Sequence, residues 1–338
     1  MNDWRIYRGA GHPHDEIRRL PPPPPWRDFS AGGADDTLAG SDRRLGVRRR
    51  LVQNHHPRPA ETDAVNAALY LRRPLLVTGN PGTGKSTLAH AVAHELGLGR
   101  VLRWPIVSRS TLQDGLYRYD AIGRLQDVQL ERAQTGAPGS TAAAAAPAGI
   151  GSYIRLGPLG TALLPSDQPR VLLIDELDKS DLDLPNDLLN ALEEGEFAVP
   201  ELERLADREP VVEVLTDDGR KVPVQGGRIR CSTFPFIVLT SNGERDFPAA
   251  LLRRCIRLEL EPPGEEQLRA MIEAHLGADA AAGEQTLVSR FLNREPGEVI
   301  ATDQLLNAIY LTQHAPRAER VTRERIADML MQPLDQPR

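Results

Sequence analysis

The stretch GNPGTGKST, residues 79–87, follows the apolar run PLLVT and precedes a helical pattern. Residues 79–86 match G-x-x-x-x-G-K-[ST], in which glycines let the backbone N–H groups point at phosphate oxygens. The positive N-terminus of the following helix adds to this attraction. We expect Lys85 to reach the terminal phosphates of a nucleotide and the Ser86 hydroxyl to bind Mg²⁺. The expected phosphate loop consists of Gly79, Asn80, Pro81, Gly82, Thr83, Gly84, Lys85, Ser86 and Thr87.

A pair of carboxylates follows a second apolar run, in RVLLIDELDKSD at residues 170–181. A strand here would carry Asp175 and Glu176 to the carboxyl edge of a parallel sheet, where the phosphate loop also lies. Asp175 suits the Mg²⁺ shell, which needs only one carboxylate. Glu176 can therefore act as a base that polarises a water aimed at the γ-phosphate.

A third segment, FPFIVLTSNGERDFPAALLRRC at residues 234–255, combines a strand pattern with polar residues at its end. Asn242 at the strand tip could reach the attacking water, although the letters SNG alone describe a turn. Arg253 and Arg254 follow eleven residues later. Taken alone, this arginine pair is equally typical of a solvated helix face.

Five apolar runs alternate with helical patterns, which predicts a five-stranded parallel sheet with helices on both faces. The runs are PLLVTG, RVLRWPIV, RVLLID, FPFIVLTSN and CIRLEL. A β-hairpin is also expected at VVEVLTDDGRKVPV, with its turn at Asp218-Gly219. After residues 262–264, Pro-Pro-Gly, only helical patterns remain. We therefore expect a flexible Pro/Gly-rich segment at 1–50, an α/β nucleotide-binding core at 51–261 with an insertion at 112–170, and a helical domain at 262–338.

Composition narrows the class of protein. The chain has 338 residues, of which 40% are hydrophobic and 26% charged, as in soluble globular proteins. It contains no run near the ~20 apolar residues of a membrane span, and its N-terminus lacks the apolar stretch of a secretion signal. We therefore expect a cytoplasmic protein without a membrane partner. The net charge of −6 and the lack of a dense basic patch argue against a nucleic-acid partner.

From about Leu51 to Gln332 the sequence resembles the AAA+ ATPases, specifically the MoxR-like branch. Residues 79–86 look like Walker A and residues 172–176 like Walker B, while Asn242 looks like sensor 1. LLRRC is similar to the segment that carries an arginine finger, with Arg254 aligning best and Arg253 close behind. RSTLQDGLYRYD and the insertion after it resemble the extra element that this branch carries before Walker B.

The resemblance implies a P-loop NTPase fold with a small α-helical lid, which binds ATP and Mg²⁺. It further implies that ATP is hydrolysed at subunit interfaces of a homo-oligomeric ring, expected to be a hexamer, which remodels or regulates an unidentified client protein. One position departs from the family. The lid helix that begins ATDQLL lacks the sensor 2 arginine, for which Arg317 is a possible substitute.

Two other classes of function remain open. A nucleotide-binding switch would recruit a partner without much turnover, although such a protein does not need Glu176. A P-loop kinase would transfer the γ-phosphate to a small molecule and would need an acceptor pocket. The acid pair together with Asn242 on a separate strand favours water as the acceptor.

Overall fold

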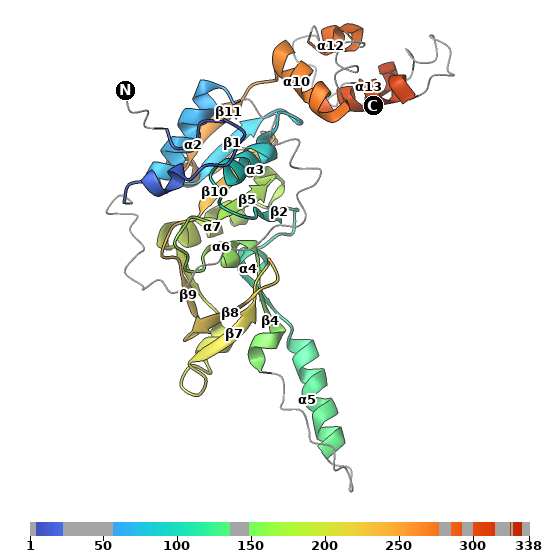
Figure 1. Cartoon of the computed structure of the whole chain (residues 1–338). Coiled ribbons are helices and arrows are strands. Elements are labelled where there is room, and N and C mark those ends of the chain that lie inside the picture. Colours follow the sequence, from blue (N-terminus) through green and yellow to red (C-terminus); the bar gives the residue numbers. More distant parts are fainter. Residues whose placement is uncertain are drawn as a thin grey trace.

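The computed structural model describes residues 5–22, 57–135, 149–276, 285–292, 300–314, 325 and 327–332. Its centre is a five-stranded, all-parallel sheet with the order β11-β1-β10-β5-β2 (Figure 1). The strands are β1 (Leu75–Gly79), β2 (Leu102–Pro105), β5 (Val171–Asp175), β10 (Phe236–Ser241) and β11 (Ile256–Leu260). The predicted P-loop α/β fold with five parallel strands is confirmed.

Each face of this sheet is covered by helices, because successive residues of a strand point to opposite faces. On one face Leu75 and Val77 pack with α2 (Pro59–Leu71) and α3 (Lys85–Glu95). On the other face Leu76 packs in a separate core with α6 (Pro158–Ala162), α7 (Asp183–Glu194) and α9 (Ala249–Arg254). Burial on both faces explains why the strands read as continuous apolar runs.

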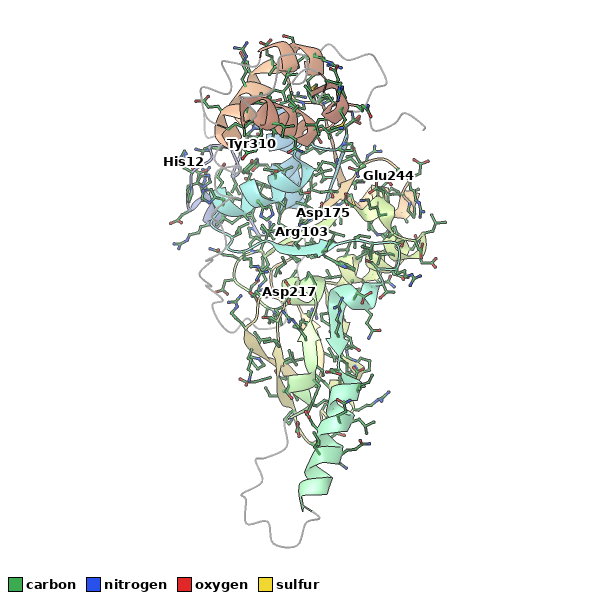
Figure 2. The ribbon with its side chains drawn as sticks, turned by 90° about the vertical axis from the view of Figure 1, so that its right-hand side faces the viewer. His12, Arg103, Asp175, Asp217, Glu244 and Tyr310 are labelled. Carbon is green, nitrogen blue, oxygen red and sulfur yellow. The ribbon has the colours of Figure 1, made fainter. Side chains whose placement is uncertain are left out.

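A second, six-stranded sheet with the order β3-β4-β7-β8-β9-β6 was not predicted. It combines the insertion with residues 196–230 and lies on the side of the core opposite to the C-terminal helices (Figures 1 and 2). The expected hairpin is present. Oδ2 of its turn residue Asp218 lies 3.7 Å from Nη1 of Arg170, the residue just before β5. Its strands are β3 (Tyr117–Tyr119), β4 (Ile154–Leu156), β6 (Glu196–Ala198), β7 (Val211–Leu215), β8 (Lys221–Gln225) and β9 (Arg228–Arg230).

Helices and 3₁₀ turns complete this part of the chain. They are α4 (Leu112–Leu116), α5 (Ala121–Thr135), α8 (Pro200–Glu203) and the 3₁₀ turns η3 (Ile150–Tyr153) and η4 (Leu177–Lys179). Helix α5 extends away from the core (Figure 1). Residues 136–148, within the Gly/Pro/Ala-rich part of the insertion, lie outside the described part of the chain.

The C-terminal part forms a helical domain with its own apolar core. It contains α10 (Glu265–Leu276), α12 (Gln285–Leu292) and α13 (Thr302–His314). Their apolar faces meet around buried residues such as Leu268, Phe291 and Leu305. Across the described residues, no helix combines the length and the apolar character that crossing a membrane would require.

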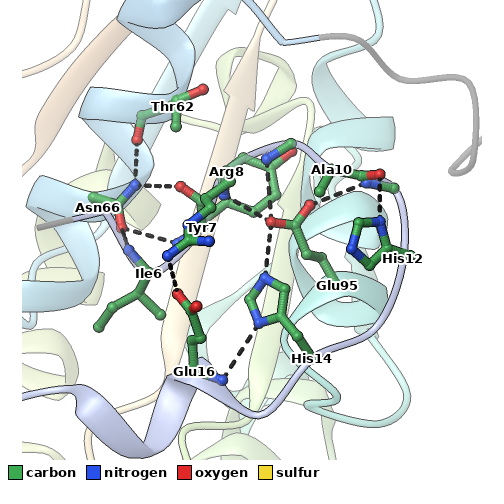
Figure 3. A network of polar contacts seen from close by, with 12 residues as sticks. Ile6, Tyr7, Arg8, Ala10, His12, His14, Glu16, Thr62, Asn66 and Glu95 are labelled. Atoms are coloured by element: carbon green, nitrogen blue, oxygen red, sulfur yellow. Dashed lines mark hydrogen bonds and ion pairs between the residues drawn. The ribbon is translucent and has the colours of Figure 1, made fainter. Parts of the chain in front are cut away.

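Residues 5–22 pack against the core, whereas the sequence suggested a flexible segment over 1–50. Ile6, Tyr7 and Ile17 are buried against α2 and α3, and η1 (Glu16–Arg19) lies within this segment. We call residues 5–22 the N-terminal strap. Its backbone is held by two buried polar side chains, Asn66 and Glu95 (Figure 3). The expectation is therefore wrong for these residues, and residues 23–50 lie outside the described part.

Candidate nucleotide site

The predicted phosphate loop connects β1 to α3. Three of its residues, Gly79, Gly82 and Gly84, have φ of 146°, 78° and 90°. A side chain at Gly79 would also collide, because a Cβ there would lie 2.5 Å from the carbonyl oxygen of Leu260. Glycine is therefore required for the curvature that exposes the backbone N–H groups.

Lys85 lies at the start of α3 and turns back into the loop. Its Nζ donates hydrogen bonds to the carbonyl oxygens of Gly79 at 2.7 Å and Asn80 at 2.9 Å. Burial lowers the pKa of Lys85, while the nearby carboxylates of Asp178, Asp175 and Glu176 oppose this effect. The ammonium is thus held at the loop by two neutral acceptors, which a phosphate could replace with charged ones.

Asp175 links the loop to the sheet. Its Oδ1 accepts hydrogen bonds from Ser86 Oγ at 2.7 Å and from Thr240 Oγ1 at 2.8 Å, and its side chain is 7% exposed. Burial alone would raise the pKa of Asp175. Hydrogen bonds from Ser86, Thr240 and Arg103 outweigh burial, so the pKa lies below its ordinary value. Asp175 is therefore held as a carboxylate beside the Ser86 hydroxyl.

This donor set fits Mg-ATP. A hydroxyl oxygen and a carboxylate are hard oxygen ligands of the kind that Mg²⁺ binds beside phosphates. The glycine-rich turn and the N-terminus of α3 offer N–H groups to the phosphate oxygens. The structure thus brings together the loop residues, Lys85, Ser86 and Asp175 as the sequence predicted.

Glu176 has an unusual backbone conformation, with φ of 62° in a residue that is not glycine. Its backbone N–H donates to Thr240 Oγ1 at 2.8 Å, which helps to hold this left-handed turn. Its Oε2 accepts a hydrogen bond from Lys179 Nζ at 2.8 Å, and both side chains are nearly half exposed. Such strained positions occur often at functional sites. The Glu176 carboxylate thus follows Asp175 directly at the edge of the sheet and has Lys179 as its partner.

Asn242 lies at the end of β10, and its backbone is tied to the segment after β5. Asp178 Oδ2 accepts hydrogen bonds from the backbone N–H groups of Asn242 at 2.8 Å and Glu244 at 3.1 Å. Asp178 is 2% exposed, and its Oδ1 has no hydrogen-bond partner in the described part of the chain. Asp178 therefore fixes the loop at Asn242 relative to the carboxylate pair.

The two candidate finger residues lie in the last turn of α9. Arg254 forms an ion pair with Glu193 of α7, and its Nη1 donates to the carbonyl oxygen of Ala250 at 3.0 Å. Arg253 is exposed, and its carbonyl oxygen accepts a hydrogen bond from Arg73. Within its own chain, Arg254 thus has a carboxylate partner that is not part of the nucleotide site.

The start of α13, where the sensor 2 arginine is missing, lies against the phosphate loop. A Cβ built on Gly82 would be 2.6 Å from the backbone nitrogen of Thr302. Ala301 and Thr302 are buried there. The possible substitute Arg317 lies outside the described residues.

Sequence reasoning missed four residues that contact the predicted site. Arg103 binds Asp175, and Lys179 binds Glu176. Thr240 and Asp178 hold the two carboxylates and the Asn242 loop in place. A hydroxyl residue near the end of the apolar run FIVLT was a signal for Thr240, and the repeated acids in DELDKSD were a signal for Asp178.

One of the comparisons with known proteins, the one with protein families, agrees with this geometry. None of the curated proteins compared with the chain matches it. The family model "AAA domain (dynein-related subfamily)" matches residues 74–255, which include the phosphate loop, the carboxylate pair, Asn242 and α9. Because this match covers more than half of the chain, the protein belongs to the AAA domain family, dynein-related subfamily, and carries a nucleotide-binding AAA+ ATPase domain.

Proposed function

We propose that this protein is a MoxR-like AAA+ ATPase that binds and hydrolyses Mg-ATP at the subunit interfaces of an oligomeric ring. ATP turnover would drive a change of shape that remodels or regulates a partner protein. The observation that carries the proposal is the hydrogen bond from Ser86 Oγ to Asp175 Oδ1, with Glu176 following directly in the chain. It joins the phosphate loop to an acid pair in one site.

We infer the roles of the residues from their positions together with the family resemblance. Backbone N–H groups of the loop and Lys85 would bind the phosphates, and Ser86 and Asp175 would hold Mg²⁺. The bound Mg²⁺ supplies positive charge that stabilises the phosphoryl group during transfer. Glu176 would accept a proton from the attacking water, and Asn242 would orient that water. In the nucleotide-free protein Lys179 occupies Oε2 of Glu176, and this exposed contact would be weak enough to give way.

The MoxR-like assignment and the proposed change of shape rest on other features, whereas the ring is proposed from the resemblance of the arginine segment in α9 to that of the family. The insertion between β2 and β5 adds α4, α5 and strands to a second sheet, and the β7–β8 hairpin precedes β10 in the chain. The helical domain meets the phosphate loop at Gly82. A change in the γ-phosphate could therefore alter the angle between the core and this domain, which would act as a lid.

A second candidate is a nucleotide switch that binds ATP without much turnover. The ion pair between Glu176 and Lys179 favours it, because the lysine occupies Oε2 of the carboxylate that is proposed as the base. This pair is nearly half exposed, and such pairs contribute only about 0–1 kcal/mol. It is therefore easily broken when a nucleotide binds, and we favour hydrolysis.

The deciding experiment compares the parent chain with Glu176→Gln, using ATP and Mg²⁺ alone. We expect the parent to release ADP and free phosphate. The variant should bind Mg-ATP nearly as well, yet hydrolyse it about 10²–10⁴-fold more slowly, because an amide cannot take the proton. Binding without phosphate release by the parent would identify a switch, and equal rates in both proteins would remove Glu176 as the base.

A further inference from the structure

Arg103 lies on β2, at the edge of the central sheet, and contacts the carboxylate assigned to Mg²⁺. Its Nη2 and Nε donate to Asp175 Oδ2 at 2.6 Å and 3.2 Å. Figure 2 shows Arg103 and Asp175 close together in the middle of the molecule. The Arg103 side chain is 47% exposed, whereas that of Asp175 is 7% exposed. A flexible, solvent-accessible cation thus covers a buried carboxylate.

Both oxygens of Asp175 are occupied in this arrangement. Oδ1 accepts from Ser86 and Thr240, and Oδ2 accepts twice from Arg103. A divalent cation beside Ser86 and Asp175 would stand next to the guanidinium, and the two positive charges would repel each other. Arg103 and Mg²⁺ therefore compete for one carboxylate.

The two partners differ in how easily they can leave. Asp175 is fixed by hydrogen bonds from two other elements, whereas Arg103 reaches it from the outside on a long side chain. A carboxylate this buried needs a positive partner, because an unpaired buried charge is strongly destabilising. Arg103 can supply the positive charge while the cation is absent, and it can move into solvent when the cation binds.

We propose that Arg103 is a latch on the metal site: it neutralises Asp175 in the nucleotide-free protein and is displaced when Mg²⁺ binds. The latch keeps the site from holding a divalent cation before a nucleotide supplies phosphate oxygens. This inference rests on the proposed function, because it takes Ser86 and Asp175 as the cation-binding residues.

The first test measures Mn²⁺ binding to the nucleotide-free protein, from the electron paramagnetic resonance signal of free Mn²⁺. Arg103→Gln should bind Mn²⁺ about 3- to 10-fold more tightly than the parent, a range typical of losing a half-exposed competing charge. Arg103→Lys keeps the charge but loses the two-pronged contact, so its affinity should lie between them. Arg109→Gln, which changes an exposed arginine six residues later, should match the parent.

Adding Asp175→Asn to Arg103→Gln should abolish the gained affinity, which locates it at this carboxylate. Unchanged or weaker Mn²⁺ binding by Arg103→Gln would overturn the latch. Persistence of the gain in the double variant would overturn it too, because the Mn²⁺ would then be bound elsewhere.

The second test measures the affinity of a fluorescent ATP analogue in excess Mg²⁺. Arg103→Gln should bind it at least as tightly as the parent, because the latch is already displaced. A tenfold weaker affinity would instead make Arg103 a phosphate ligand and contradict the latch. If the parent binds no analogue while the Mn²⁺ result holds, the proposed ATPase function fails and the cation latch stands.

Discussion

Lys85 makes the most direct residue-level prediction. Its ammonium is held by two carbonyl oxygens of the phosphate loop, where it can turn to phosphates. Lys85→Ala should weaken ATP binding by about 10- to 150-fold, since a charge-assisted hydrogen bond contributes about 1.5–3 kcal/mol. Titration with a fluorescent ATP analogue measures this affinity.

Lys179→Ala is the matched control for that titration. Lys179 is also close to the carboxylate pair, but it is bound to Glu176 and nearly half exposed. Removing Lys179 should leave the ATP affinity within about threefold of the parent's, because exposed ion pairs contribute little free energy. Equal losses in the two variants would mean that Lys85 acts only through the general charge of the site.

At the scale of single residues, motifs predicted the loop and the carboxylates but not their partners. The loop residues follow one another in the chain, so their spacing alone carries the chemistry. Arg103 and Thr240 come from different strands. They meet Asp175 only because β2 and β10 both pair with β5, at registers that place Pro105 opposite Asp175 and Leu239 opposite Ile174. Strand order and register cannot be read from one sequence.

Among the larger elements, the N-terminal strap gives a stability prediction. Asn66 is fully buried, accepts the N–H groups of Ile6 and Tyr7, and donates to the carbonyl oxygens of Tyr7 and Thr62 (Figure 3). Asn66→Ala would leave several buried backbone groups unpaired, at about 1–3 kcal/mol each. We expect the midpoint of thermal unfolding to fall by at least roughly 6 °C, because about 3 kcal/mol is lost at the low end and each kcal/mol corresponds to about 2–4 °C.

Asn190→Ala provides the comparison, because Asn190 is exposed on α7 and such changes usually alter stability by less than about 0.5 kcal/mol. Circular dichroism melts of both variants would measure the difference. A midpoint unchanged in Asn66→Ala would show that the hydrogen bonds from Asn66 to the strap add nothing to the stability of the folded core.

The contact between α13 and the phosphate loop predicts a second effect at this scale. Gly82→Ala should destabilise the protein twice, through strain at φ of 78° and through collision with Thr302. Gly219→Ala is matched for strain, with φ of 83°, but its Cβ would meet nothing within 4 Å. The unfolding midpoint should therefore fall further for Gly82→Ala, by an amount that corresponds to about 1–3 kcal/mol. Equal shifts would show that the lid can move away without loss.

The strap and the second sheet are the parts of the fold that the sequence did not predict. Four strands of that sheet, β3, β4, β6 and β9, have three residues each, too few to establish a period of two. The strap buries Ile6, Tyr7 and Ile17, whose spacing follows no regular period, and its backbone is held by Asn66 and Glu95, which lie far away in the chain. Long apolar runs such as FIVLT were predictable because their own residues carry the burial signal, whichever distant strands and helices cover them.

At the scale of the whole molecule, the open question is whether one chain completes its own site. Alternation of strands and helices was enough to predict a parallel sheet, and the Pro-Pro-Gly at 262–264 was enough to suggest where the helical domain begins. Contacts between subunits leave no such pattern. The arginines of α9 are the residues through which the proposed ring can be tested.

In the proposed ring, an arginine of α9 would reach the γ-phosphate bound to the next subunit. Arg254, the better match to the family, would first have to leave Glu193, whereas Arg253 is already exposed. An arginine finger can increase the rate 10³–10⁵-fold. Arg254→Ala should therefore bind ATP yet hydrolyse it slowly at every protein concentration, while the parent's activity per subunit should rise with concentration as rings assemble.

Mixing variants tests the shared site directly. Lys85→Ala subunits lack a working phosphate loop but keep Arg254, and Arg254→Ala subunits have the opposite defect. In a mixed ring an intact arginine can face an intact loop, so part of the phosphate release should return. The same mixture is then made with Arg253→Ala in place of Arg254→Ala. Only the variant that lacks the finger arginine should be inactive alone and regain activity when it is mixed with Lys85→Ala subunits. Activity that is independent of concentration, with no rescue for either arginine, would mean that each subunit hydrolyses ATP alone.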